Sequence, residues 1–162
     1  MLDLYTNDEI STHLAGISDR SSPSFDLPFL AAKVGPGMPW PTLVSWHDRH
    51  PVPCMIANGE QSMILVRLAA DRDMDYTTDG FNIAVLDPAD REPSPEVLYA
   101  VDRGPDTVLR RVRPGQDKLY LVTDEDLNHP LRWEQVPLPV RGDLFRGRVR
   151  WLGRERLAKS RT

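Results

Sequence analysis

The chain of 162 residues is long enough for one domain with a sizeable core, and 40% apolar with 27% charged residues is typical of a globular protein. A formal net charge of −4 argues against a general nucleic-acid-coating protein, which needs a basic excess. The single cysteine, Cys54, excludes an internal disulfide and a thiolate metal site, and we expect no metal or cofactor. No apolar run reaches the length of a membrane span, so we expect a cytoplasmic protein without membrane contact.

Residues 1–26 are predicted to form an N-terminal arm. Polar residues can cap a short helix over residues 8–15, which Gly16 ends. The sequence SDRSSPS at 18–24 has the composition of a linker. The next segment, LPFLAAKVGPGMPWP at 27–41, is too rich in proline and glycine for a helix.

From there the chain is predicted to be mostly β-strand, because short apolar or alternating runs are separated by Gly, Pro and Asp. Such spacing indicates a small, strongly bent β-fold over residues 27–153, followed by a basic tail at 154–162. The predicted strands cover residues 63–70, 81–87, 96–102, 107–113, 118–124, 132–139 and 143–153.

The last predicted strand alternates apolar residues or glycine with arginine. One face is expected to carry Phe145, Gly147, Val149 and Trp151. The other face carries Arg146, Arg148 and Arg150. We interpret this arginine face as a candidate binding surface for an acidic partner or phosphate; the alternative is a solvated strand face.

Two histidines, His47 and His50, are spaced as metal ligands on a helix can be. Pro51 follows His50 and disfavours a helix there, so a polar loop is predicted instead. Cys54 is interpreted as a small buried apolar residue.

The stretch from 64 to 112 resembles the S24 autopeptidase family of LexA repressors and UmuD-type mutagenesis proteins. In that family an apolar strand leads into a G-D-S-M turn with the serine nucleophile, then D-G-D and a second apolar strand, and later V-K-R-L with the lysine base. This chain has Met74 in the turn, the sequence DGFNIAVLD at 79–87 and VLRRV at 108–112.

Both catalytic residues of that pattern are replaced. Asp73, or in another register Arg72, stands where the serine is expected, and Arg110 stands where the lysine is expected. Asp73 and Arg110 are 37 residues apart, close to the family spacing. Arginine stays protonated in proteins and cannot replace a lysine base, so we expect an Asp73–Arg110 salt bridge in place of the dyad, or two unpaired exposed charges. The three lysines lie outside the motif, at Lys33, Lys118 and Lys159.

The resemblance also includes a cleavage segment of the form L-P-F/L…A-G-x-P-x-P. The chain has LPFL at 27–30 and PGMPWP at 36–41, with Pro36 in place of the small residue before the scissile Gly37. Proline should disturb the extended presentation of that bond. The first 26 residues are too short for the DNA-binding domain of LexA, so the layout is UmuD-like and no sequence-specific DNA binding is expected.

A rival nucleophile is Ser62, because NGEQSM at 58–63 also resembles G-D-S-M. Ser62 is 48 residues from Arg110, which is longer than the family spacing, and it lacks a lysine partner. Peptidase activity through Ser62 therefore requires a different base.

The resemblance implies a catalytically inactive, UmuD-like protein that acts by binding. Expected partners are a second copy or an active UmuD-like relative, and a translesion DNA polymerase or the RecA filament of the SOS response to DNA damage. The alternatives are an active S24-like peptidase that uses Ser62, or a small β-rich interaction or immunity protein unrelated to S24.

Overall fold

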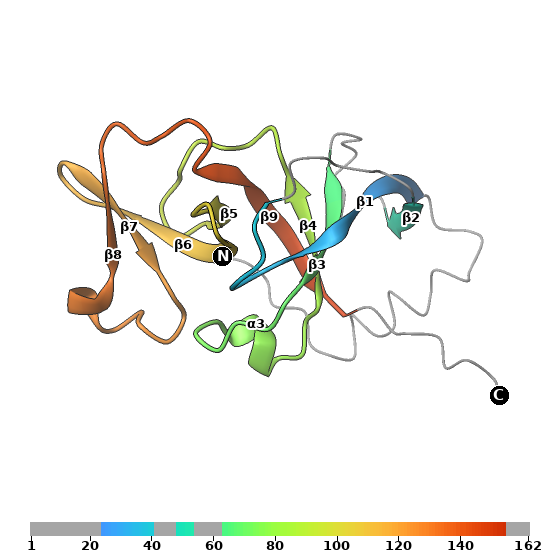
Figure 1. Ribbon diagram of the computed structural model, residues 1–162, viewed down its shortest axis with the longest axis horizontal. Helices are drawn as coiled ribbons and strands as arrows, with labels where there is room; N and C mark the ends of the chain where they lie inside the picture. Colours follow the sequence, from blue (N-terminus) through green and yellow to red (C-terminus); the bar gives the residue numbers. More distant parts are fainter. Residues whose placement is uncertain (1–23, 41–47, 54–62, 155–162) are drawn as a thin grey trace.

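A computed structural model describes residues 24–40, 48–53 and 63–154. The described chain is mostly β, as predicted, and its strands form a single nine-stranded sheet (Figure 1). The strand order is β2-β1-β3-β4-β9-β5-β6-β7-β8. The helix expected over 8–15 lies outside the described residues, as does Ser62.

The N-terminal half of the sheet holds β1 (Ser24–Val34), β2 (Asp48–Pro53), β3 (Ile64–Leu68) and β4 (Ile83–Asp87). β1 pairs antiparallel with β2 and parallel with β3, and β3 pairs antiparallel with β4. β1 begins within the segment expected to be an arm. The polar loop predicted around His50 is wrong for residues 48–50, whose backbone belongs to β2.

The C-terminal half is an antiparallel meander of β5 (Leu98–Asp102), β6 (Thr107–Pro114), β7 (Lys118–Val122) and β8 (Glu134–Pro137). The described residues also include two short helical turns. They are α3 (Asp75–Thr78), between β3 and β4, and η2 (Pro130–Arg132), before β8.

Strand β9 (Phe145–Gly153) joins the two halves, because it lies between β4 and β5 and is antiparallel to both (Figure 1). Its pairing register shifts twice. Opposite β5 the pairing passes from Phe145 to Gly147, and opposite β4 it passes from Val149 to Trp151. Each shift leaves one arginine as a bulge.

The two bulges contradict the predicted faces of the last strand. Phe145 packs with Tyr99 in one core cluster, with ring centroids 5.2 Å apart. Val149 belongs to a second cluster, and Trp151 packs against a third. A bulge reverses the side to which the following residues point, so the two bulges place Val149 on the side opposite to Phe145 and Trp151. Phe145 and Trp151 pack with different clusters.

Among the described residues, no helix has the length and apolar character needed to cross a membrane.

Candidate functional site

The candidate site is centred on a buried ion pair between Arg110 and Asp71. Arg110 lies in the middle of β6, and Asp71 lies in the loop after β3. The Arg110 Nη1 and Asp71 Oδ2 atoms are 2.6 Å apart, and the two side chains are 6% and 3% exposed. Arg110 therefore pairs with a carboxylate, as predicted. The prediction that this carboxylate belongs to Asp73 is wrong, because Asp71 supplies it. Asp73 is exposed.

The local turn explains why Asp71 rather than Asp73 faces inward. The Asp71 carboxylate accepts a hydrogen bond from the backbone N–H of Asp73 at 3.2 Å, and the N–H of Asp71 donates to Thr77 Oγ1 at 2.8 Å. The first bond ties the Asp71 carboxylate to the backbone of its own loop, and the second ties the Asp71 backbone to Thr77. Alignment of Met74 with the methionine of the S24 turn predicts Asp73 at this position, two residues after the acid that occupies it.

Tyr76 fixes the same loop from within the core. Its hydroxyl donates to the backbone carbonyl of Ala69 at 2.9 Å, and its side chain is buried with Met74 beside it in the core. Burial, and then the nearby Asp71 carboxylate, raise the pKa of Tyr76 above its ordinary value. The hydroxyl therefore stays protonated and available as a donor.

The loop after β3 and the helical turn α3 also contact the segment that follows β7. The Asp124 carboxylate accepts hydrogen bonds from the Asp75 backbone N–H at 3.0 Å and from Arg111 Nε at 2.8 Å. The N–H of Glu125 donates to the Asp73 carbonyl at 3.1 Å. Asp73 thus contributes its backbone to the site, while its side chain points to solvent.

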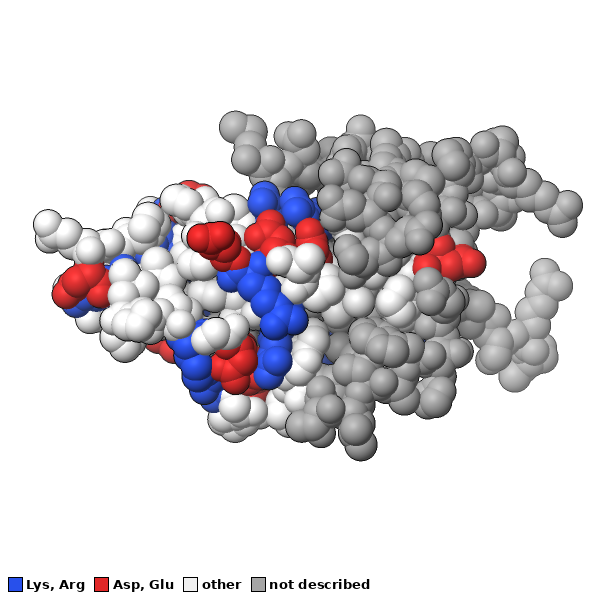
Figure 2. All heavy atoms as spheres, turned by 90° about the horizontal axis from the view of Figure 1, so that it is seen from above, with Lys and Arg blue, Asp and Glu red and all other residues white. Residues whose placement is uncertain are grey.

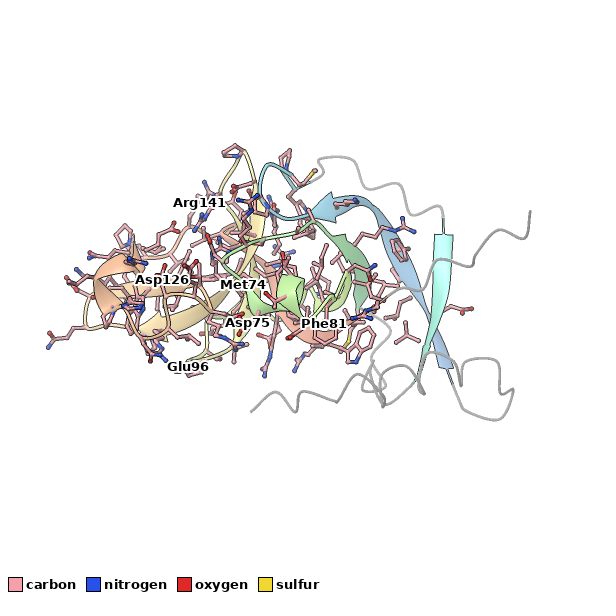
Figure 3. All side chains as sticks on the ribbon, turned by 90° about the horizontal axis from the view of Figure 1, so that it is seen from below. Met74, Asp75, Phe81, Glu96, Asp126 and Arg141 are labelled. Atoms are coloured by element: carbon pink, nitrogen blue, oxygen red, sulfur yellow. The ribbon has the colours of Figure 1, made fainter. Side chains whose placement is uncertain are left out.

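An open groove of about 590 Å³ lies beside this contact, and its walls carry charges of both signs. Asp75 on α3 and Glu96 before β5 line the groove (Figure 3). Arg111 and Asp124, which pair with each other, also line it. Asp124 is paired with Arg111, and Glu96 with Arg113, so the groove has no single-sign character.

The segment expected as a cleavage site forms a tight turn that contacts the start of β6 and the segment after β3. The N–H of Met38 donates to the Gly35 carbonyl at 3.0 Å, and Gly37 has φ +74°. With proline and then a positive-φ glycine at its centre, this is a type II turn. The Pro36–Gly37 peptide is therefore part of a turn instead of an extended strand.

That turn is hydrogen-bonded on both sides. The N–H of Thr107, at the start of β6, donates to the Met38 carbonyl at 2.8 Å. The N–H of Ala69, two residues before Asp71, donates to the Val34 carbonyl at 2.7 Å. The turn thus contacts both chain segments that supply the buried ion pair.

The three arginines predicted to share one face of β9 are each paired with an acid of the same chain. Arg146 Nε donates to Asp102 Oδ2 at 2.8 Å, and Arg150 Nη2 lies 2.9 Å from Asp87 Oδ2. Arg148 lies 3.4 Å from an Asp90 carboxylate oxygen. The three arginine side chains are between 25% and 34% exposed, so what they present to solvent is part of an ion pair. Figure 2 shows basic atoms bordered by acidic ones on one side of the molecule.

The pKa of Asp102 reflects its hydrogen bond with Arg146. Burial acts to raise the pKa of this carboxyl group, but hydrogen bonds from the Gly104 N–H and from Arg146 outweigh burial and lower it.

The central pair lacks the chemistry of a serine peptidase. Arg110 remains protonated and cannot accept a proton from a nucleophile. The Asp71 carboxylate is occupied by Arg110 and by a backbone N–H. Without a hydroxyl and an amine at these two positions, an acyl-enzyme mechanism has neither nucleophile nor base.

A comparison of the chain with protein-family models found no match, and a comparison with curated proteins also found none.

Proposed function

We propose that this chain is a non-catalytic relative of the S24 autopeptidases and that it acts by binding other proteins. The observation that carries the proposal is the buried Asp71–Arg110 pair. It joins the loop after one apolar strand to the middle of a later strand, which are the two locations that the S24 motif assigns to its serine and lysine. An ion pair in that space holds the two elements together without chemistry.

Two further observations support permanent attachment of the N-terminal segment. The Pro36–Gly37 peptide lies inside a hydrogen-bonded turn, where a nucleophile would meet a bent backbone. Strand β1, which precedes the turn, lies between β2 and β3, and its residues Leu27 and Phe29 are in the core. Cleavage after Pro36 would cut the connection of an inner strand.

In this proposal the chain resembles the uncleaved form of a UmuD-like protein and has a regulatory role. Its partners would be a second copy or an active relative, and a translesion DNA polymerase or the RecA filament. The proposed location is the cytoplasm.

The test restores the catalytic pair at the positions that the structure assigns. The triple variant Asp71→Ser/Arg110→Lys/Pro36→Ala carries a serine, a lysine and a small residue before Gly37. Its matched control places the serine two positions away, as Asp73→Ser/Arg110→Lys/Pro36→Ala. Wild type and both variants are incubated at alkaline pH and with activated RecA filament, and their intact masses are measured after circular dichroism has verified folding.

We expect wild type and the control to stay intact, and the Asp71→Ser variant to be cut between positions 36 and 37. Cleavage of wild type at that bond would refute a non-catalytic role, and its loss in Ser62→Ala would assign the activity to Ser62. A folded Asp71→Ser variant that stays intact under both conditions would argue against the S24 relationship.

A further inference from the structure

The groove beside α3 has unused hydrogen-bond donors, although its walls carry charges of both signs. Arg111 uses its Nε for Asp124, and Arg148 lies 3.4 Å from its acceptor, Asp90. Within the part of the chain that the structure describes, the other guanidinium nitrogens of these two arginines have no acceptor, and they are not buried. A guanidinium has five N–H donors, so each arginine can bind further oxygen atoms.

Two of the acids that line the groove have no such capacity left. The Asp124 oxygens accept hydrogen bonds from Arg111 Nε and from the Asp75 backbone N–H. The Glu96 oxygens accept hydrogen bonds from Nε and Nη2 of Arg113. The unused hydrogen-bonding capacity is therefore mainly that of donors, and it matches a carboxylate.

The two arginines with unused donors come from strands on either side of β5. Arg111 is on β6 and Arg148 is on β9. Val97 and Leu127, both half-buried, line the same groove. Its volume of about 590 Å³ is within the range of ligand-binding sites. A peptide segment with both acidic and apolar side chains fits these features.

The N-terminal residues of the chain have this composition. Residues 1–19 contain no lysine or arginine, but they contain acids at positions 3, 8, 9 and 19. Asp3 lies between Leu2 and Leu4, so an acid has apolar neighbours on both sides.

We propose that residues 2–9 bind in the groove of their own molecule, with carboxylates on Arg111 and Arg148 and leucines against Val97 and Leu127. Residues 10–23 connect this segment to β1, which begins at Ser24. At about 3.3 Å per residue the connection can span about 50 Å. A compact domain of this length is about 40 Å across, so the groove is within reach.

Binding within one molecule also compensates for the weakness of exposed ion pairs. The short connection raises the effective concentration of the segment to about the millimolar range. A nucleic-acid strand fits the groove less well, because its phosphates would meet Asp75 and Glu96, which are both exposed (Figure 3). The net charge of −4 acts in the same direction.

This inference goes beyond the proposed function and does not depend on the Asp71–Arg110 pair. One consequence does rest on the proposed function: the bound segment would regulate access of a partner protein to the groove. Cleavage at position 36 tests the former active site, whereas occupation of the groove is measured separately, so either proposal can fail alone.

The experiment compares backbone amide chemical shifts, measured by NMR, in three full-length proteins. They are wild type, the neutral-segment variant Asp3→Asn/Asp8→Asn/Glu9→Gln, and the matched control Asp79→Asn/Asp117→Asn/Asp143→Asn. Both variants remove three negative charges, and the control residues are exposed and lie outside the groove. The amides of Val97, Arg111 and Leu127 report on the groove.

A second measurement supplies the segment as a separate molecule. A peptide of residues 1–10 is titrated into the neutral-segment variant, and into the same variant with Arg148→Gln added. A scrambled peptide of the same composition is the sequence control.

We expect the groove amides to differ between wild type and the neutral-segment variant at every protein concentration, and to keep their wild-type shifts in the control. The peptide should move the same amides. Arg148→Gln should raise its dissociation constant about threefold or more.

Three results would overturn the proposal. The groove amides could be identical in wild type and the neutral-segment variant. Their difference could depend on protein concentration, which would assign the contact to a second copy. The scrambled peptide could bind as tightly, which would assign the groove to acidic peptides in general.

Discussion

Removing the charge of Asp71 should reveal how strongly the buried ion pair holds the fold together. In Asp71→Asn the shape of the side chain is kept, but the Arg110 guanidinium, whose side chain is 6% exposed, loses its carboxylate. Leaving one member of a buried pair uncompensated costs about 3–5 kcal/mol. The asparagine oxygen can still accept a hydrogen bond, so we expect a loss of about 3 kcal/mol in the free energy of unfolding.

The assay is equilibrium urea unfolding at pH 7, followed by far-UV circular dichroism, with Asp73→Asn as the matched control. Asp73 has an exposed carboxylate in the same loop, so its substitution should change stability by less than about 0.5 kcal/mol. The double variant Asp71→Asn/Arg110→Met removes the unpaired charge and should recover more than half of the loss. A loss below about 1 kcal/mol for Asp71→Asn, or equal losses for the two asparagine variants, would refute the reasoning.

Three further substitutions test other contacts of the fold. Tyr76→Phe should cost about 1 kcal/mol at pH 7 through the lost hydrogen bond to Ala69. Because the folded pKa of Tyr76 is raised, its contribution is present below about pH 10 and falls above it; thermal unfolding of Tyr76→Phe should therefore decline less steeply in alkali. Arg146→Gln should make the loss of stability on acidification below about pH 4 shallower, because the lowered pKa of Asp102 stabilises the fold above that pH; acid titration followed by fluorescence measures this. Gly35→Ala should destabilise by about 1–3 kcal/mol in urea, because its new methyl group would lie 2.7 Å from the Ala69 Cβ atom.

The strands from residue 63 onward were predictable because each is a short apolar run bounded by turn residues. The two strands before residue 63 were not predicted, because both contain proline. Pro28 lies in β1 opposite Arg49 of β2, at a point where pairing with β3 has not yet begun, since that register starts at Phe29. Strand β2 contains Pro51 and lies at the sheet edge. Proline is tolerated at such positions, so its presence does not exclude a strand.

The site itself was predictable to within two residues. Three acids alternate in the sequence DRDMD, at 71, 73 and 75, and local pattern alone does not distinguish them. The choice is made by Arg110, 39 residues away in sequence, which reaches Asp71 only after β6 has packed against the loop. The bulges in β9 were missed for the same reason. Alternation predicts faces only while the register is unbroken, and the neighbouring strands β4 and β5 impose the shifts.

The central place of β9 has a consequence for how this protein is made. It follows every other described strand in the sequence, yet it supplies the pairing between β4 and β5. Until residues 145–153 have left the ribosome, the nascent chain carries two partial sheets, each with an apolar edge strand, β4 or β5, exposed. Synthesis of this stretch therefore ends the period in which the chain is most prone to aggregate, and slow translation just before residue 145 should lower the yield of folded protein.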